Sequence, residues 1–295
     1  MLLVGMLTAG CRQKSAETPV APVTDRGDLP LPSLPASLTD PEERADYLAA
    51  HFWDALDFSD TIRSLDTAFI EQNFANYSTV LALAPGRDTA VGNLLGRIRA
   101  ASPAAYGLFV YVAEKYLYEP DSPVFDEQSY LPFARYAAGQ GGDEAVVAQA
   151  RCEEILKNAP GTVAPDFAFE TPGGKRRLLY PKASAPLLLM FYEPDCDRCR
   201  SAMEAISSDP AIAGAISSGM LRFTAVYLGT DRTLWAQHAA QLPPEWTAGI
   251  EPTGWVDDDE LYIIRATPSF YLIGADGRII LKDARLQEIF AALGR

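Results

Sequence analysis

The sequence predicts two folded domains: an all-α domain, followed by an α/β domain in which helices flank a mixed central sheet. Apolar residues recur at helical spacing through residues 39–158, where no comparable alternating strand pattern occurs. A continuous apolar run at 187–192 is typical of a buried central strand, and strand and helix patterns alternate after it. The chain of 295 residues is also too long for one small core.

Helix signals divide the first domain, expected at residues 39–158. Thr39-Asp40-Pro41-Glu42 has capping-box spacing with proline in the first turn, so we expect Thr39 to cap the first helix. Proline and glycine then separate further expected helices at 65–83, 88–100, 104–117, 127–138 and 143–157. The core should contain most of the aromatic side chains of this domain, including Trp53, Phe58, Phe69, Phe74, Tyr77 and Tyr106.

Potential ligands in this domain have simpler structural explanations. Asp54, Asp57 and Asp60 recur at helical spacing, which favours a solvated face, and we assign no metal. His51 fits a core or boundary position, because the chain has only two histidines. Cys152 lies in the last expected helix, where a lone thiol usually behaves as a small buried hydrophobe.

The composition limits the classes of partner. With 25 basic and 39 acidic residues, the net charge is -14, and such a surface repels a nucleic-acid backbone. We therefore expect no nucleic-acid partner. The four cysteines are too few for a disulfide-stapled scaffold, and two of them form one Cys-x-x-Cys unit. That pairing indicates redox chemistry.

The N-terminus resembles the end of a bacterial lipoprotein signal peptide. Residues 1–10 form a short apolar run that ends in small residues before Cys11, although no Lys or Arg precedes the run. The resemblance implies a signal segment at 1–11, a lipid on Cys11 that anchors the chain to a membrane, and a location in the cell envelope facing the periplasm. The alternative is an ordinary hydrophobic N-terminus with an incidental cysteine. A membrane-spanning helix needs about 20 apolar residues, more than this run contains.

Residues 12–38 are expected to form a disordered tether. Five prolines stand there among polar and charged residues, a composition that buries too little apolar surface to order itself. The tether would hold the folded domains away from the membrane.

The chemistry-bearing motif follows the apolar run of the second domain. Residues 193–200 read EPDCDRCR and place Cys196 and Cys199 between a strand and a segment with helical spacing. A helix N-terminus stabilises a thiolate, which is the form that attacks disulfides. Cys199, three residues on, lies on the same side of the first turn. We therefore expect Cys196 to be the nucleophile and Cys199 the resolving thiol.

Three further signals complete the second domain. A buried strand is expected at 223–228 and another at 265–273, with Pro268 near its beginning. Asp276-Gly277 predicts a hairpin, followed by a strand at 278–282 and a terminal helix at about 284–293.

These motifs, together with Ala164-Pro165-Asp166-Phe167, stand in the order found in thioredoxin-like proteins. Residues 159–295 thus resemble a thioredoxin-like domain. The whole chain resembles a membrane-tethered thioredoxin-like lipoprotein of the thiol-disulfide oxidoreductase type. Residues 52–61 resemble the opening of a helical domain of unknown function that often precedes such domains.

The resemblance implies roles for residues outside the dithiol. Pro268 would be a cis-proline facing the active-site helix, and the backbone of Thr267 would pair with bound substrate. Trp255 lies in a Pro- and Gly-containing stretch before Thr267 and is a candidate substrate contact, with core packing as the alternative. No cofactor is implied.

The sequence departs from the family pattern around the dithiol. Asp195 replaces the usual Trp before Cys196, and Ala202 stands where many membrane-tethered reductases place a buried glutamate. The proton-transfer partner of Cys199 is therefore not identified.

We expect the protein to reduce or isomerise disulfides of extracytoplasmic proteins, supplied with electrons by an upstream thiol protein. Three acids near Cys196, against Arg198 and Arg200, should leave its pKa only modestly lowered, which favours a reducing potential. The main alternative is a lipid-tethered binding protein whose helical domain captures a partner. Zinc binding is not expected, because a second pair of ligands is hard to find in the sequence. A peroxidase is not expected either, because it would need Thr or Ser three residues before Cys196, where neither occurs.

Overall fold

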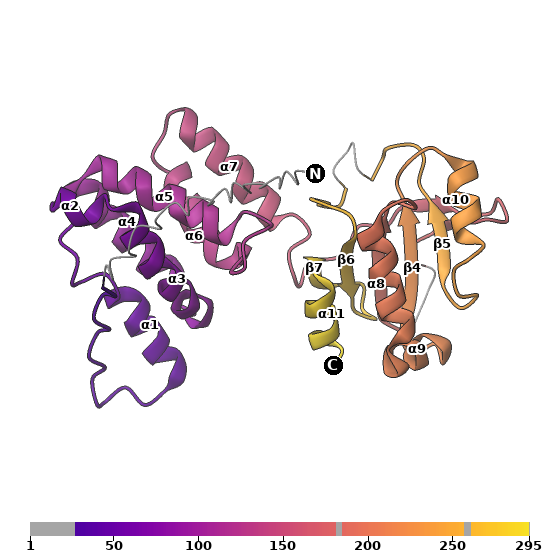
Figure 1. The fold of residues 1–295 in the computed structure, drawn as a ribbon, viewed down its shortest axis with the longest axis horizontal. Coiled ribbons are helices and arrows are strands. Elements are labelled where there is room, and N and C mark those ends of the chain that lie inside the picture. Colours follow the sequence, from indigo (N-terminus) through magenta and orange to yellow (C-terminus); the bar gives the residue numbers. More distant parts are fainter. Residues whose placement is uncertain (1–26, 181–184, 257–260, 295) are drawn as a thin grey trace, which may run out of the picture.

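The computed structural model describes residues 27–180, 185–256 and 261–294, which form a helical domain beside an α/β domain (Figure 1). The expected signal segment, including Cys11, lies outside the described residues. Residues 27–38, the described part of the expected tether, have neither helix nor strand. Leu29 is nevertheless buried, and its N–H donates to Asn73 Oδ1 at 2.7 Å. Leu29 thus contacts the helical domain, whereas most of the other residues from 30 to 38 are exposed.

Seven helices occur in the described part of the first domain. They are α1 (Pro41–His51), α2 (Thr61–Ser64), α3 (Thr67–Leu83), α4 (Arg87–Ala101), α5 (Pro103–Leu117), α6 (Glu127–Ala138) and α7 (Asp143–Leu156). All but the four-residue α2 match expected helices. The first cap was wrong: Asp40, whose Oδ1 accepts from the N–H groups of Glu42 and Glu43, caps α1 in place of Thr39.

Aromatic side chains fill the core of the helical domain, as expected. Trp53 is 1% exposed and lies between Tyr77 and Phe109, with ring centroids 5.7 Å and 4.8 Å away. Tyr106 is only partly buried, at the edge of this core. Cys152 is buried in the same cluster, so it packs as the small hydrophobe that its helix position predicts.

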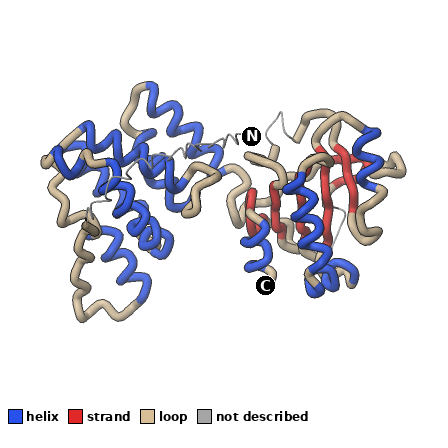
Figure 2. The backbone as a smooth tube through the Cα atoms, in the orientation of Figure 1, coloured by secondary structure: helices blue, strands red, loops and turns tan. Residues whose placement is uncertain are grey.

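A mixed sheet of seven strands, drawn red in Figure 2, forms the centre of the described α/β domain. Its order is β2-β1-β5-β4-β3-β6-β7. The strands are β1 (Ala168–Glu170), β2 (Arg176–Leu178), β3 (Leu187–Tyr192), β4 (Arg222–Tyr227), β5 (Thr247–Ile250), β6 (Ser269–Ile273) and β7 (Ile279–Ala284). β3 and β4 are parallel and β6 is antiparallel to β3. β7 is the edge nearest the helical domain (Figure 1).

Side chains alternate between the two faces of each strand, so the sheet separates two hydrophobic cores. Leu188, Met190 and Tyr192 of β3 face the helices α8 (Asp197–Ser208), α9 (Pro210–Ser217), α10 (Arg232–Ala239) and α11 (Leu286–Ala292). Leu187, Leu189 and Phe191 face the opposite layer, which in the described residues consists of strand and irregular segments around Phe167 and Tyr262. Central β3, fully buried on both faces, thus delivers the chain at its carboxyl end to the start of α8.

The expected strand at 265–273 is shorter in the structure, because β6 begins only after Pro268. The expected hairpin joins β6 to β7, and Gly277 adopts the left-handed φ of 79°. Helices α9 and α10 and strands β1 and β5 were not anticipated from the sequence.

Candidate dithiol site

Cys196 is the N-cap of α8, directly after β3 and a short turn. Its backbone is extended, with φ -83° and ψ 117°, and its Sγ accepts from the N–H of Cys199 at 3.2 Å. Serine and aspartate use the same geometry to cap helices, so sulfur here occupies the place of a capping oxygen. The N–H groups of the first turn, which have no carbonyl partner within the helix, thus point toward the Cys196 sulfur.

The two thiols differ in their access to solvent. Cys196 is half-buried, whereas Cys199 is 1% exposed and packs within the core below α8. Both are free thiols. A partner disulfide can therefore reach Cys196 first, whereas Cys199 is enclosed in the core.

The two thiols also differ in pKa, for reasons that lie in the same arrangement. Burial alone would raise the pKa of Cys196. Hydrogen bonds from the Cys199 thiol, from the N–H groups of Cys199 and Arg198 and from the Thr267 side chain outweigh burial and lower that pKa. Burial, reinforced by the hydrogen bond to Cys196, raises the pKa of Cys199 to about 12. Cys196 is thus the thiol that ionises more readily.

Thr267 and Pro268 lie against the dithiol, as the resemblance implies. Their peptide bond is cis, and the Cys196 thiol faces the Thr267 carbonyl oxygen at 3.8 Å. The sequence separation of 71 residues is bridged because β6, which follows Pro268, pairs with β3, which precedes Cys196.

Charged neighbours affect Cys196 less than the sequence suggested. Arg200 pairs with Asp197 at 2.9 Å, and both side chains are more than half exposed, where solvent screens their effect. The pKa of Cys196 is lowered mainly by hydrogen bonds to its sulfur, and not by charged side chains such as Arg200 and Asp197.

A groove of about 490 Å³ lies beside Asp197 and Pro268, the neighbours of Cys196 and Thr267 in the sequence. It is lined by residues of α8, of the Pro268 turn and of the start of α11, including Arg198, Ala202, Phe270 and Arg285. Sequence reasoning missed Phe270 and Arg285, because their approach to α8 depends on sheet and helix packing and leaves no local signal.

Ala202 is buried at 6% exposure, so no carboxylate occupies the place of the family glutamate. Tyr192 lies in the same core cluster as Cys199. Burial, with a smaller contribution from Cys199, raises the pKa of this phenol, which keeps it neutral.

Trp255 is 44% exposed, so the core-packing alternative for this residue was wrong. It is not among the residues that line the groove beside Pro268. Trp246 fills the core instead, with its ring centroid 4.1 Å from that of Phe223.

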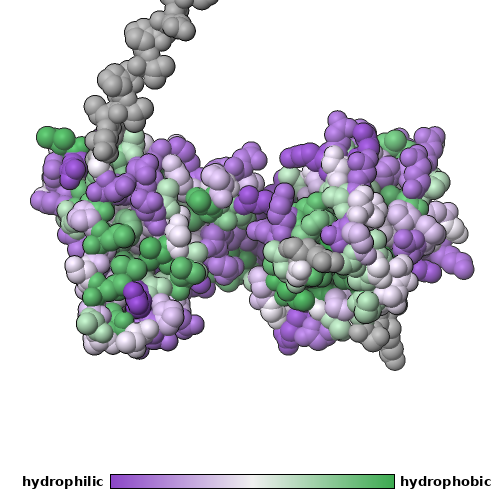
Figure 3. All heavy atoms as spheres, turned by 60° about the horizontal axis from the view of Figure 1, so that its bottom comes forward, coloured by the Kyte–Doolittle hydropathy of each residue, from purple (hydrophilic) through white to green (hydrophobic). Residues whose placement is uncertain are grey.

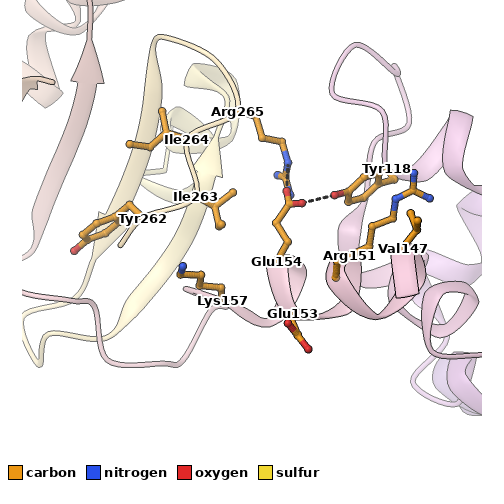
Figure 4. Close-up of a pocket in the computed structure, with 11 residues that line it drawn as sticks. Tyr118, Val147, Arg151, Glu153, Glu154, Lys157, Tyr262, Ile263, Ile264 and Arg265 are labelled. Atoms are coloured by element: carbon orange, nitrogen blue, oxygen red, sulfur yellow. Dashed lines mark hydrogen bonds and ion pairs between the residues drawn. The ribbon is translucent and has the colours of Figure 1, made fainter. Parts of the chain in front are cut away.

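A larger cavity of about 850 Å³ lies elsewhere, where α7 meets the segment from Tyr262 to Arg265 (Figure 4). Neither Cys196 nor Cys199 lines it. The size of a cavity therefore does not identify the reactive site in this protein. The position of the two thiols identifies it.

The described residues lack both a candidate metal centre and a helix that could span a membrane. They contain no group of three or more His, Cys, Asp or Glu side chains arranged to hold a metal ion. Asp54 instead pairs with His51 and Arg97, both at 2.7 Å. None of the described helices is long and apolar enough to cross a membrane.

We predict that limiting iodoacetamide at neutral pH labels Cys196 well before Cys199 or Cys152. Among the three described cysteines, only Cys196 combines solvent access with a lowered pKa, because burial raises the pKa of Cys199 and of Cys152. Peptide mapping by mass spectrometry after partial reaction measures the order. First labelling of Cys199 or Cys152 would contradict the assigned thiol roles.

The fold and the dithiol together define a thioredoxin-like protein with an added helical domain. Residues 9–158 match the family model described as "Domain of unknown function (DUF5106)", and the chain belongs to this family. A comparison with curated proteins gave no match.

Similar solved structures include one that matches most of the chain and two that match less than half of it. A thioredoxin-like protein from Bacteroides caccae has 29% identity and a TM-score of 0.81, over 90% of this chain and 97% of its own. A conserved protein of unknown function from Bacteroides fragilis has 32% identity and a TM-score of 0.45, over 46% of this chain and 98% of its own. The thioredoxin domain of a thiol-disulfide oxidoreductase from Bacteroides vulgatus has 20% identity and a TM-score of 0.41, over 46% of this chain and 96% of its own.

Proposed function

We propose that the protein is a thiol-disulfide oxidoreductase that reduces or isomerises protein disulfides through Cys196 and Cys199. The observation that carries this proposal is the unequal environment of the two thiols: one accessible at a helix N-terminus with a lowered pKa, the other buried with a raised pKa. A pure binding role would leave this difference without a use.

The reaction proceeds in two exchanges. The Cys196 thiolate attacks one sulfur of a substrate disulfide, forms a mixed disulfide, and releases the other substrate sulfur as a thiolate. Cys199 then loses its proton and attacks Cys196 Sγ, which releases the remaining substrate sulfur. The substrate gains two electrons, the protein becomes an internal disulfide, and an upstream thiol protein returns it to the dithiol form.

The backbone at Thr267 supports substrate alignment. Its carbonyl faces Cys196 Sγ, so an extended substrate segment that pairs with this turn would bring its sulfur toward the nucleophile. The groove between α8 and α11 offers apolar surface and two cationic side chains, Arg198 and Arg285, beside that path. We propose exposed Trp255 as a further substrate contact, outside this groove.

The proposed location is the bacterial cell envelope, facing the periplasm, with a lipid on Cys11. The apolar run before Cys11 supports this location, as does the proline-rich segment after it. Disulfide exchange also suits an extracytoplasmic compartment, where protein disulfides persist.

An insulin-reduction assay with the full chain and dithiothreitol as electron donor tests the proposed activity. The parent chain should accelerate insulin reduction, and Cys196→Ser should be indistinguishable from dithiothreitol alone. Cys152→Ser is the matched control, because that thiol lies in the core of the helical domain and should leave the rate unchanged. A parent chain without effect, or an active Cys196→Ser variant, would refute the proposal.

A further inference from the structure

A buried cluster of charged side chains joins the two domains. Arg265 of the thioredoxin-like domain pairs with Glu127 in the first turn of α6 and with Glu154 in α7, at 2.7 Å for the second pair. Arg265 Nη1 also lies 3.3 Å from Asp283 Oδ2 in β7. The Arg265 side chain is 13% exposed and that of Glu127 11%. Charges so well shielded from solvent interact strongly and hold a defined geometry.

Lys282 in β7 ties the same two helices from a second point. Its ammonium donates to the carbonyl oxygens of Glu154 at 2.7 Å and Ile155 at 3.1 Å, in the last turn of α7. It also lies 3.4 Å from Glu127 Oε2, and its side chain is 2% exposed. The Tyr118 hydroxyl donates to Glu154 Oε2 at 2.5 Å, which fixes that carboxylate from the helical side (Figure 4).

The linker between the domains adds a neutral connection. Asn158, two residues after the end of α7, accepts from the N–H of Ile263 at 3.0 Å and donates to the carbonyl of Leu261 at 3.2 Å. The segment leading to Arg265 is therefore held on the helical domain as well. In the space-filling view, the two lobes meet at a narrow waist with hydrophilic side chains (Figure 3).

This cluster brackets the turn that faces the nucleophile. Arg265 precedes Thr267 by two residues, and Ser269, on the other side of the turn, donates to Asp283 Oδ1 at 2.6 Å. Asp283 thus holds both flanks of the turn, and the Thr267 carbonyl between them faces Cys196 Sγ. The helical domain reaches this turn through Arg265.

We propose that the helical domain is a positioning module for the dithiol site, acting through the Arg265 cluster on the Thr267–Pro268 turn. The inference rests on the proposed redox function and assigns the domain of unknown function a part in it. Glu127 and Glu154 are positioning residues, because they touch neither thiol. When their hold on Arg265 weakens, Thr267 spends less time against Cys196. Its side chain, whose hydrogen bond lowers the pKa of Cys196, then stabilises the thiolate less, and its carbonyl aligns substrate less well.

The variant Glu127→Gln in the full chain tests this coupling. It keeps the shape of the side chain and removes its charge. We expect the pH at half-maximal alkylation of Cys196 to rise, with the rate at pH 7 at least threefold lower, a shift of about half a pH unit. We also expect kcat/KM for insulin to fall. Glu71→Gln is the matched control, because Glu71 pairs with Lys115 at 2.6 Å wholly within the helical domain.

The milder variant Arg265→Lys keeps the charge but loses the forked geometry, and it decides the outcome if Glu127→Gln does not fold. A shift in the Cys196 profile for the cluster variants and not for Glu71→Gln supports the inference. An unchanged profile in a folded cluster variant, or an equal shift in the control, overturns it. Alkylation requires no turnover, so this result is independent of whether the parent chain reduces insulin.

Discussion

Replacing Cys199 with serine should convert the protein into a trap that remains covalently attached to its substrate. Cys196 keeps its position at the α8 N-terminus and still attacks a disulfide, but no second thiol then releases the substrate sulfur. We expect multiple turnover to fall roughly 100-fold or more, equivalent to about 2.7 kcal/mol. The mixed disulfide should accumulate as a band on a non-reducing gel that dithiothreitol removes.

The trap also tests the order of the two exchanges. Cys196→Ser should form no such adduct, because Cys199 is 1% exposed and its pKa is raised to about 12. The double variant Cys196→Ser with Cys199→Ser supplies the background. Adducts formed equally by both single variants would show that the thiols are interchangeable and would contradict the proposed roles.

Local chemistry made most of the helical domain predictable. Asp126 precedes α6 and caps it with its carboxylate, and Pro103 opens α5 at a position where no N–H is needed. Such signals lie within a few residues of each helix end. The cap of α1 was misplaced by one residue because Thr39 and Asp40 are both good caps and only the backbone conformation distinguishes them.

The dithiol was predictable for the same reason, since Cys196, its strand and its helix are contiguous in sequence. The position of Pro268 required the resemblance to a known family, because a proline near the start of a strand does not by itself indicate what it faces. The Arg265 cluster joins residues separated by 138 positions, and ion pairs at that distance leave no periodic pattern. Trp246 and Trp255 are two tryptophans in one short segment of the sequence. Only the packing in the folded protein distinguishes the buried ring of Trp246 from the exposed ring of Trp255.

Trp53→Ala should strongly destabilise the helical domain. The ring is 1% exposed and contacts Phe52, Tyr77 and Phe109, with centroids 4.8 to 5.7 Å away. Truncation of a buried Trp costs about 3–5 kcal/mol, through lost burial and the cavity left behind. Urea unfolding followed by circular dichroism at helical wavelengths measures the loss in unfolding free energy.

Two variants separate burial from other effects of the substitution. Trp53→Phe should cost less, about 1–2 kcal/mol, because it keeps most of the ring and removes an indole N–H that has no hydrogen-bond partner. Trp255→Ala deletes the same side chain from a site that is 44% exposed and should change the unfolding free energy by less than about 1 kcal/mol. If Trp53→Ala is no more harmful than Trp255→Ala, the ring of Trp53 is not part of a close-packed core, and the packing described for this domain is wrong.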